Sequence, residues 1–356
     1  MKNFSKDLLV WYNVNKRHFP WRDNINVYHT WICEIMSQQT VISVVLPRFK
    51  EFINEIPNLN SLASCSDDKL RKLWAGLGYY ARARNLRKGA QYILNEFGGV
   101  FPNNNNDWLK VPGCGPYTAA VIASICFNEP IACVDGNVIR VVSRLLNLQS
   151  GVWEKDGLNK INSYVNEWIA KDHPGDFNQA MMDLGATVCK KQNPSCYICP
   201  VKIYCQAYAS DSISLCPPVK PRKDTKLENV FALVFEQASS QNILLVKRNH
   251  GFLNKTIGFP LIKENQAEFI STFLQELKKI GLNSSILKGE FKHSITHHKI
   301  LAKAIIIKNV KCEVNIHMLA KKYFFGDEWH WLPISQLKHN LSSSLDLKVL
   351  KLLSSL

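Results

Sequence analysis

The fold is decided by residues 111–120, which read VPGCGPYTAA. Two glycines, Gly113 and Gly115, flank a single residue at the point where one helical pattern ends and another begins. Without side chains at these positions, backbone N–H groups and the N-terminus of the following helix can approach a phosphate group closely. The stretch therefore predicts a hairpin between two helices that binds phosphate, although glycine turns between helices are common.

Four cysteines lie close together further along the chain, separated by six, two and five residues: Cys189, Cys196, Cys199 and Cys205. Zinc ribbons generally present two close cysteine pairs that are far apart, whereas four thiolates in one short loop suit a compact iron–sulfur cubane. We expect one 4Fe-4S cluster here, with zinc as the alternative. The other seven cysteines are expected to be buried thiols in a reducing compartment.

The chain of 356 residues is basic, with 44 Lys and Arg against 29 Asp and Glu, a net charge of +15. Such an excess favours a polyanionic partner but is weak evidence alone. Between residues 71 and 88, cations alternate with aromatic rings that can stack on bases. A solvated helix face is the alternative for this segment. No apolar run is long enough to span a bilayer and residues 1–10 resemble no signal peptide, so we expect a cytoplasmic protein associated with the nucleoid.

Two domains are expected from the pattern of apolar residues. From Leu8 to Tyr208 these residues recur at helical spacing, which predicts an all-α bundle of about ten helices. Residues 210–226 are rich in Ser, Pro and Lys, which indicates a linker. Strand-like runs at 230–235, 243–246 and 300–307, with a helix at 267–279, predict a small α+β domain. The boundaries are 1–208 for the helical region, 209–226 for the linker and 227–356 for the second domain.

Two carboxylates are candidates for acid–base chemistry. Glu34 is flanked on both sides by apolar residues at helical spacing, so partial desolvation should raise its pKa and let it keep a proton near neutrality. Asp135 precedes Gly136 about twenty residues beyond the hairpin. Most glutamates on helices are exposed and most Asp-Gly pairs only form turns, so neither residue is specific by itself.

Several segments together resemble the MutY-type adenine DNA glycosylases, a helix-hairpin-helix family related to endonuclease III. They are WICEIMSQQT at 31–40, WAGLGYYARARNL at 74–86, GPYTA at 115–119, VDGNV at 134–138 and the cysteine loop at 189–205. The resemblance runs from Phe19 to Cys205 with little interruption. It implies a helix-hairpin-helix glycosylase with an Fe-S loop that excises adenine mispaired with 8-oxoguanine or guanine in duplex DNA, as part of base excision repair.

The resemblance also implies catalytic roles. Glu34 would protonate the flipped adenine, and Asp135 would stabilise the oxocarbenium-like sugar. Tyr117 and Asn137 would support them by hydrogen bonding. Relatives of the endonuclease III type carry a Schiff-base lysine at the position of Tyr117, and tyrosine cannot form that imine. We therefore expect a monofunctional glycosylase.

Further residues are implied for DNA contact and base binding. Extruding a base leaves a gap in the duplex, and Gln39 and Tyr79 are expected to fill it. The alternative roles are purely structural: Gln39 could cap a loop with its amide, and Tyr79 could be a core aromatic residue. The remaining implied contacts are Gly113, Gly115, Arg82 and Arg84 for the DNA backbone, and Arg22, Asn178 and Gln179 for the base pocket.

Residues 227–356 resemble the Nudix-like C-terminal domain of the same family, which reads 8-oxoguanine through a loop matched here by Thr296 and His297. Ile295 stands where the family carries phenylalanine, and Ser37 where it carries leucine. The clustered acids of a Nudix hydrolase are missing, so pyrophosphatase activity is not expected. We expect a monomer that binds no membrane. The alternatives are an endonuclease III-like glycosylase with lyase activity and a catalytically silent DNA-binding protein.

Overall fold

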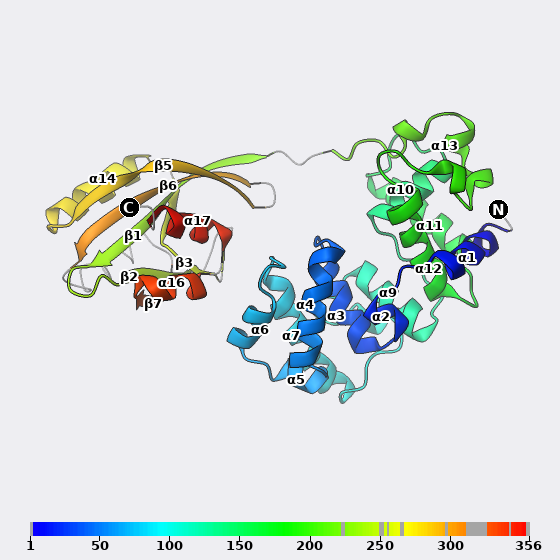
Figure 1. Ribbon diagram of the computed structural model, residues 1–356, viewed down its shortest axis with the longest axis horizontal. Coiled ribbons are helices and arrows are strands. Elements are labelled where there is room, and N and C mark those ends of the chain that lie inside the picture. Colours follow the sequence, from blue (N-terminus) through cyan, green and yellow to red (C-terminus); the bar gives the residue numbers. More distant parts are fainter. Residues whose placement is uncertain are drawn as a thin grey trace. The chain divides into compact units, whose positions relative to one another are not determined.

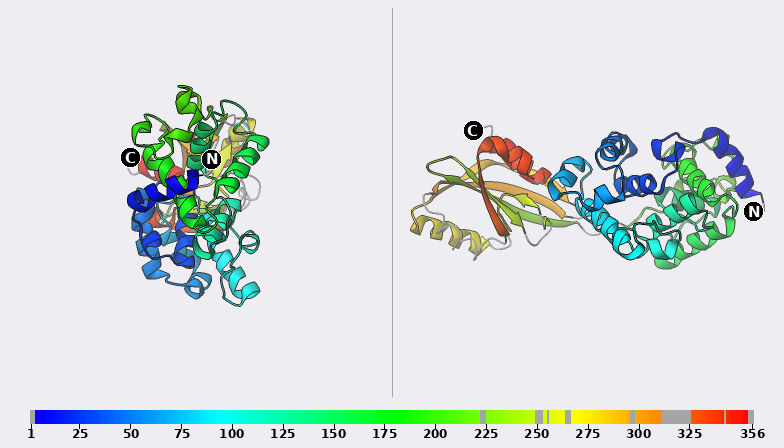
Figure 2. Two further views of the ribbon diagram at one scale, coloured as in Figure 1. Left: turned by 90° about the vertical axis from the view of Figure 1, so that its right-hand side faces the viewer. Right: turned by 90° about the horizontal axis from the view of Figure 1, so that it is seen from below.

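The computed structural model describes residues 3–221, 225–248, 253–254, 256–263, 267–295, 298–310, 326–341 and 343–353 (Figure 1). The chain divides into two compact units, Met1–Lys220 and Pro221–Leu356. The first unit is built of helices, and the second carries the strands (Figure 2). Within the described ranges, no helix is both long and apolar enough to cross a membrane.

The first unit confirms the predicted all-α character, although several of its helices are only one turn long. A π-helix, η1 (Leu184–Val188), and three short 3₁₀ turns, η2 (Cys196–Ile198), η3 (Lys202–Tyr204) and η4 (Ile213–Leu215), lie in its C-terminal part. The α-helices are α1 (Phe4–Asn15), α2 (Pro20–Asp23), α3 (Val27–Ser37), α4 (Ile42–Glu55), α5 (Leu59–Ala63), α6 (Asp67–Leu73), α7 (Ala81–Phe97), α8 (Asn105–Trp108), α9 (Pro116–Phe127), α10 (Gly136–Leu145), α11 (Lys155–Trp168), α12 (Pro174–Asp183) and α13 (Gln206–Ala209).

Two hydrophobic cores organise the helical unit, and α9 belongs to both. The first core is formed by α2 to α9 and contains the fully buried Trp31 and Trp74. The second packs α1 against α9, α10, α11 and α12 and contains Phe177. Ala119 of α9 lies in the first core, whereas the next residue, Ala120, lies in the second. A helix that is apolar on all sides is buried on all sides, and this property allows α9 to join the two cores.

The segment predicted as a linker packs in part on the helical unit. The Nε atom of Arg144 donates to the carbonyl oxygen of Cys216 at 3.0 Å, and Trp153 Nε1 donates to that of Pro218 at 2.7 Å. Lys220 lies over the ring of Trp153, with its ammonium 5.1 Å from the centroid. The helical unit therefore extends to Lys220, beyond the predicted end at residue 208.

The second unit is a mixed sheet with helices, and it confirms the strands and the helix predicted from the sequence. The sheet runs in the order β3-β2-β1-β6-β5, with β4 paired to β1 and β7 to β2; β1 and β6 are parallel and the other pairs antiparallel. The elements are β1 (Lys226–Gln237), β2 (Ile243–Arg248), β3 (Ile257–Gly258), β4 (Leu261–Lys263), α14 (Ala267–Lys279), β5 (Asn283–Ile295), β6 (His298–Val310), β7 (Gly326–Leu332), α16 (Ile334–Asn340) and α17 (Ser344–Leu353).

Both faces of this sheet are covered. Phe235 of β1 packs in a cluster with Phe273 of α14, whereas its neighbour Val234 packs in a second cluster with Leu337 of α16. Successive residues of a strand point to opposite faces, so β1 serves both clusters. Thr296 and His297, predicted to read the lesion, lie outside the described residues.

Candidate active site

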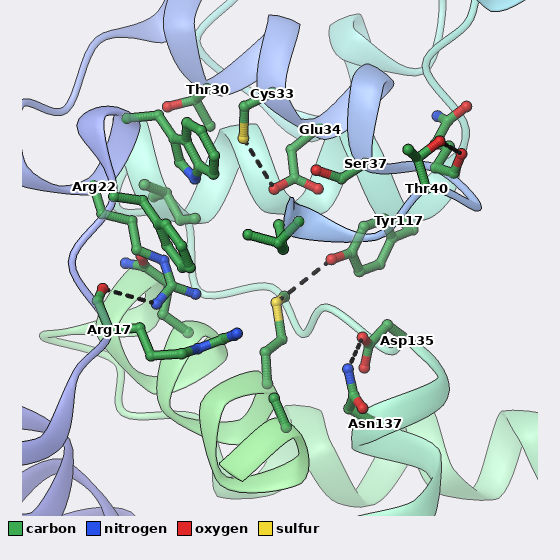
Figure 3. Close-up of a pocket in the computed structure, with 18 of the residues that line it drawn as sticks. Arg17, Arg22, Thr30, Cys33, Glu34, Ser37, Thr40, Tyr117, Asp135 and Asn137 are labelled. Atoms are coloured by element: carbon green, nitrogen blue, oxygen red, sulfur yellow. Dashed lines mark hydrogen bonds between the residues drawn. The ribbon is translucent and has the colours of Figure 1, made fainter. Parts of the chain in front are cut away.

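A cavity of about 500 Å³ collects the predicted catalytic residues of the helical unit (Figure 3). Glu34 enters from α3 of the first core, and Tyr117 from the first turn of α9. Asp135 and Asn137 enter from the start of α10, in the second core. Residues separated by a hundred positions in the chain thus line one cavity, because α3 packs on α9, while α12 packs on both α9 and α10.

Glu34 is placed to act as an acid near neutral pH. Burial raises the pKa of its carboxyl to about 7, while the positive charge of Arg22 lowers it and the negative charge of Asp135 raises it again. The Cys33 thiol donates to Glu34 Oε1 at 3.8 Å. A carboxyl with this pKa is protonated in a large fraction of molecules at pH 7, as a general acid requires.

Asp135 has surroundings of the opposite kind. It is the N-cap of α10, and its Oδ1 accepts a hydrogen bond from the backbone N–H of Val138 at 2.8 Å. Its Oδ2 accepts from Asn137 Nδ2 at 2.9 Å, and Asn137 Oδ1 accepts in turn from Arg140 Nη2 at 2.9 Å. Two donors at the N-terminus of α10 therefore fix the orientation of this carboxylate. The cavity thus holds one acid suited to donate a proton and a second acid that is held in place by hydrogen bonds.

Tyr117 presents a neutral hydroxyl between the two acids. Burial, followed by the negative charges of Glu34 and Asp135, raises the pKa of the phenol well above its usual range. The hydroxyl donates to Met182 Sδ at 3.4 Å (Figure 3). The position therefore supplies a hydrogen-bond donor and no amine.

A pair of arginines sharing one aspartate forms a wall of the cavity. Arg17 and Arg22 both line it, and both donate to the carboxylate of Asp183, which is fully buried. Arg22 is predicted from the sequence, but Arg17 and Asp183 are not. The signal for Asp183 is its position as a lone acid at the end of the apolar run Ala180-Met181-Met182.

Asn178 and Gln179, both predicted to form the base pocket, are adjacent in α12 but differ in direction. Gln179 lines the cavity. Asn178 is fully buried, where its amide nitrogen donates to Ser124 Oγ at 3.0 Å and its amide oxygen accepts from the backbone N–H of Cys133 at 3.0 Å. The Asn178 amide therefore joins α12 to α9 and to the segment before α10 by hydrogen bonds, and it does not face the cavity.

The glycine hairpin has the geometry expected of a phosphate-binding turn. Gly113 adopts φ +90°, which favours glycine, and a Cβ added there would lie 3.1 Å from the Cβ of Asn85. Gly115 is the N-cap of α9, and a Cβ added there would have no neighbour within 4 Å. Open space at Gly115 leaves the N-terminal N–H groups of α9 accessible to a ligand.

Two exposed loops carry the residues predicted to enter the duplex, and Arg82 ties them together. Gln39, after α3, and Tyr79, before α7, adopt positive φ angles of 57° and 47°. Arg82 Nη1 donates to the carbonyl oxygens of Met36, at the end of α3, at 2.9 Å and of Gln38, in the first loop, at 2.5 Å; its Nη2 donates to that of Leu77, in the second loop, at 2.8 Å. The Arg82 guanidinium, predicted to contact DNA, thus binds the two loops to each other, while Arg84, two residues further along α7, is half-buried.

The four cysteines of the predicted cluster line one small cavity in the second core. Arg144 and Lys202 line the same cavity, and Arg144 Nη1 lies 3.3 Å from Cys189 Sγ. Arg144 also donates to the backbone oxygens of Lys190 and Lys191, which fixes the start of the loop. In the described part of the chain, no three His, Cys, Asp or Glu side chains are grouped so as to hold a single metal ion.

Comparisons with known proteins identify DNA repair proteins as relatives of this chain. The family of HhH-GPD superfamily base excision DNA repair proteins matches residues 32–170. An adenine DNA glycosylase of Buchnera aphidicola subsp. Baizongia pistaciae is 34% identical over 305 residues, which cover 83% of each protein. The adenine DNA glycosylase of Homo sapiens is 34% identical over 356 residues; the match covers 83% of this chain but 65% of the human protein.

Solved structures resemble the helical unit. A thermostable thymine-DNA glycosylase superposes with a TM-score of 0.54 and 27% identity, covering 59% of this chain and 96% of that one. An endonuclease III in a non-covalent complex with DNA superposes with a TM-score of 0.51 and 22% identity, covering 59% and 95%. The second likeness concerns the fold alone.

Proposed function

Because the chain belongs to the adenine DNA glycosylase family of base-excision repair enzymes, we propose that it excises adenine mispaired with 8-oxoguanine or guanine in duplex DNA. One observation carries this proposal. Glu34 and Asp135, one from each core, line the same cavity with Tyr117 and Asn137 beside them. A DNA base that leaves the duplex needs a closed site of this kind, with polar groups that act on it.

The two acids divide the chemistry. Adenine is a poor leaving group as an anion, so Glu34 donates its proton to a ring nitrogen and the glycosidic bond breaks with its electron pair on the base. The sugar becomes cationic, and the carboxylate of Asp135 stabilises that charge until water adds to the anomeric carbon. Asn137 orients Asp135 through their hydrogen bond. Tyr117 offers no amine for an imine with the sugar, which supports a monofunctional glycosylase.

Duplex binding is assigned to the hairpin and the two tied loops. The N–H groups at Gly113 and Gly115 face the DNA backbone, and α7, whose Asn85 lies against Gly113, supplies Arg84 as a cation. Gln39 and Tyr79 enter the gap that the flipped adenine leaves. Their positive φ angles support this role, because strained conformations of residues other than glycine cluster at functional sites.

We assign a 4Fe-4S cluster to Cys189, Cys196, Cys199 and Cys205. The donor set fits this group: a cluster takes one thiolate per iron, so its ligands surround a cavity, as these four side chains do. When bound, the cluster supplies a rigid thiolate-ligated centre that orders the loop. The Arg144 guanidinium next to Cys189 offsets the negative charge of its ligands, and Lys202 offers a cation to DNA.

The second unit is assigned to lesion recognition as a Nudix-like domain. Its mixed sheet flanked by helices supports the assignment, and α14 carries only Glu268 and Glu276 in place of the clustered acids of a pyrophosphatase. Thr296 and His297 would contact the 8-oxoguanine, with Ile295 in place of an aromatic residue. The proposed enzyme works as a monomer on the nucleoid, in the cytoplasm and without a membrane.

A cleavage experiment tests the proposal. The purified protein is incubated with end-labelled duplexes that carry 8-oxoguanine:A, G:A or T:A, and strand breaks are scored with and without hot alkali. We expect breaks at the mispaired adenine only after alkali, strongest opposite 8-oxoguanine and absent from T:A. Breaks without alkali would indicate lyase activity, and tight binding without any break would indicate a silent DNA-binding protein. Either result contradicts the proposal.

A further inference from the structure

The carboxylate of Asp183 is the most heavily hydrogen-bonded acid beside the cavity, yet it does not line it. Its Oδ1 accepts from Arg17 Nε at 2.8 Å and from Arg17 Nη2 at 2.6 Å. Its Oδ2 accepts from the Arg17 backbone N–H at 3.1 Å and from Arg22 Nη1 at 2.8 Å. The Asp183 side chain is 0% exposed, against 33% for Arg17 and 14% for Arg22.

The three residues carry one net positive charge at the wall of the cavity. Burial opposes ionisation of Asp183, but the hydrogen bonds and charges of Arg22 and Arg17 hold its pKa below the usual range, so it is an anion at neutral pH. Tyr12 lies beside the three, and burial raises its pKa to about 12, so it stays neutral. The charged groups at this wall are therefore two guanidiniums and one carboxylate, which together carry one positive charge.

Arg22 connects this charge to the chemistry. It shares the cavity with Glu34, and after burial it is the strongest influence on the proton affinity of that acid. The other titratable groups that interact with Glu34 are Asp135, which precedes α10, Tyr117 and Cys126 on α9, Cys133 between α9 and α10, and its own neighbour Cys33. Among them, only Arg22 is held by a further charged group that is itself fully buried.

We propose that Asp183 acts on Glu34 without touching it: together with Arg17 and Arg22, it sets the net charge of the cavity wall that this acid experiences. This inference rests on the proposed role of Glu34 as the proton donor. Charges in a poorly solvated site act strongly over a few ångströms, so a change of one unit at this wall reaches the acid. Asp183 itself touches neither the base nor the sugar.

The experiment changes the charge of the wall in both directions and measures the single-turnover rate of adenine excision as a function of pH. In the wild type, the rate falls as the pH rises through the pKa of Glu34. Asp183→Asn leaves two positive charges, which favour the ionised Glu34, so the midpoint of that fall should move down by about one pH unit. Above both midpoints the rate should be about tenfold lower, and near pH 5 it should be unchanged.

Arg17→Gln and the double variant complete the series. Arg17→Gln leaves no net charge and should move the midpoint up by about half a unit. Asp183→Asn combined with Arg17→Gln restores one positive charge, and its midpoint should return to that of the wild type. Because Arg17 is one-third exposed, its variant should fold even if Asp183→Asn does not, so the upward shift is a test by itself.

The outcomes separate the two proposals. A wild-type rate without the fall at high pH would count against Glu34 as the acid, whatever the variants do. A normal wild-type profile, with variants that change the rate equally at every pH and keep the midpoint, would overturn the inference about Asp183. Circular dichroism and affinity for the mispaired duplex, measured on every variant, exclude a loss of fold as the cause of a shift.

Discussion

Each of the two units buries an aspartate that binds arginine, but the surroundings of the arginines differ. Asp183 in the helical unit binds Arg17 and Arg22, and both arginines also face the cavity. Asp346 in the second unit binds Arg248 through two hydrogen bonds of 2.6 and 3.1 Å, and both side chains are almost fully buried.

The remaining partners of Asp346 explain the difference. Its Oδ1 also accepts from the backbone N–H of Phe259, and Ser343 Oγ binds the same carboxylate. Arg248 Nη1 also donates to Thr256 Oγ1 and Nη2 to the Phe259 carbonyl, so this pair fastens α17 to the β3–β4 region. An ion pair that faces a cavity can tune chemistry, whereas one enclosed by backbone can only hold the fold together.

The largest effect should come from the proton donor of the helical unit. Glu34→Gln keeps the shape of the side chain but removes its proton, so excision should fall by about 10²- to 10⁴-fold while the protein stays folded. Single-turnover kinetics on an 8-oxoguanine:A duplex measure the rate, and affinity for the same duplex serves as the control. Asp135→Asn is the matched variant, because asparagine also caps a helix. Full activity in either variant would refute the mechanism.

The second largest effect should be one of stability. Asp346→Ala leaves the buried Arg248 unpaired, which should lower the free energy of unfolding of the second unit by about 3–5 kcal/mol. Urea denaturation, followed by fluorescence, measures the change. Glu328→Ala removes the partner of Lys247 from an exposed ion pair of the same unit and should have little effect. Equal losses in the two variants would show that Asp346 has no special structural role.

Arg82 extends the comparison. It lies in the helical unit, but like Arg248 it joins separate segments of the chain through hydrogen bonds. Lysine has three donors on one nitrogen and cannot span the carbonyl groups of both loops, so Arg82→Lys should reduce excision about tenfold, which corresponds to about 1.4 kcal/mol. Arg84→Lys is the matched control and should mainly change the salt dependence of DNA binding. If the two variants behave alike, Arg82 acts as a phosphate contact and not as a tie.

Tyr117→Phe should have the smallest effect. It removes only the hydroxyl next to Glu34 and Met182, so excision should slow about fivefold, since one hydrogen bond contributes about 1 kcal/mol. Single-turnover rates at pH 6 and 8 measure it. A loss as large as that of Glu34→Gln would assign Tyr117 a direct part in the reaction.

The sequence was sufficient wherever a local pattern carried the information. The hairpin glycines, strands β1, β2 and β6 and helix α14 follow from spacing, composition and turn chemistry, and the two acids follow from motifs that resemble a family. The roles of Asn178, Arg82 and Asp183 were out of reach, because each depends on which way a side chain points and on partners far away in the chain. Arg17 and Asp183 are 166 positions apart, and no local pattern relates them.

Helix α9 lies in both cores, so it sets the spacing between the core that carries Glu34 and the one that carries Asp135. Each residue of an α-helix adds about 1.5 Å and a turn of about 100°. A single insertion or deletion within α9 would therefore rotate one core against the other and draw the two acids apart. The helix should accept changes of side chain far more readily than changes of length, because its length fixes the distance between the two acids of this enzyme.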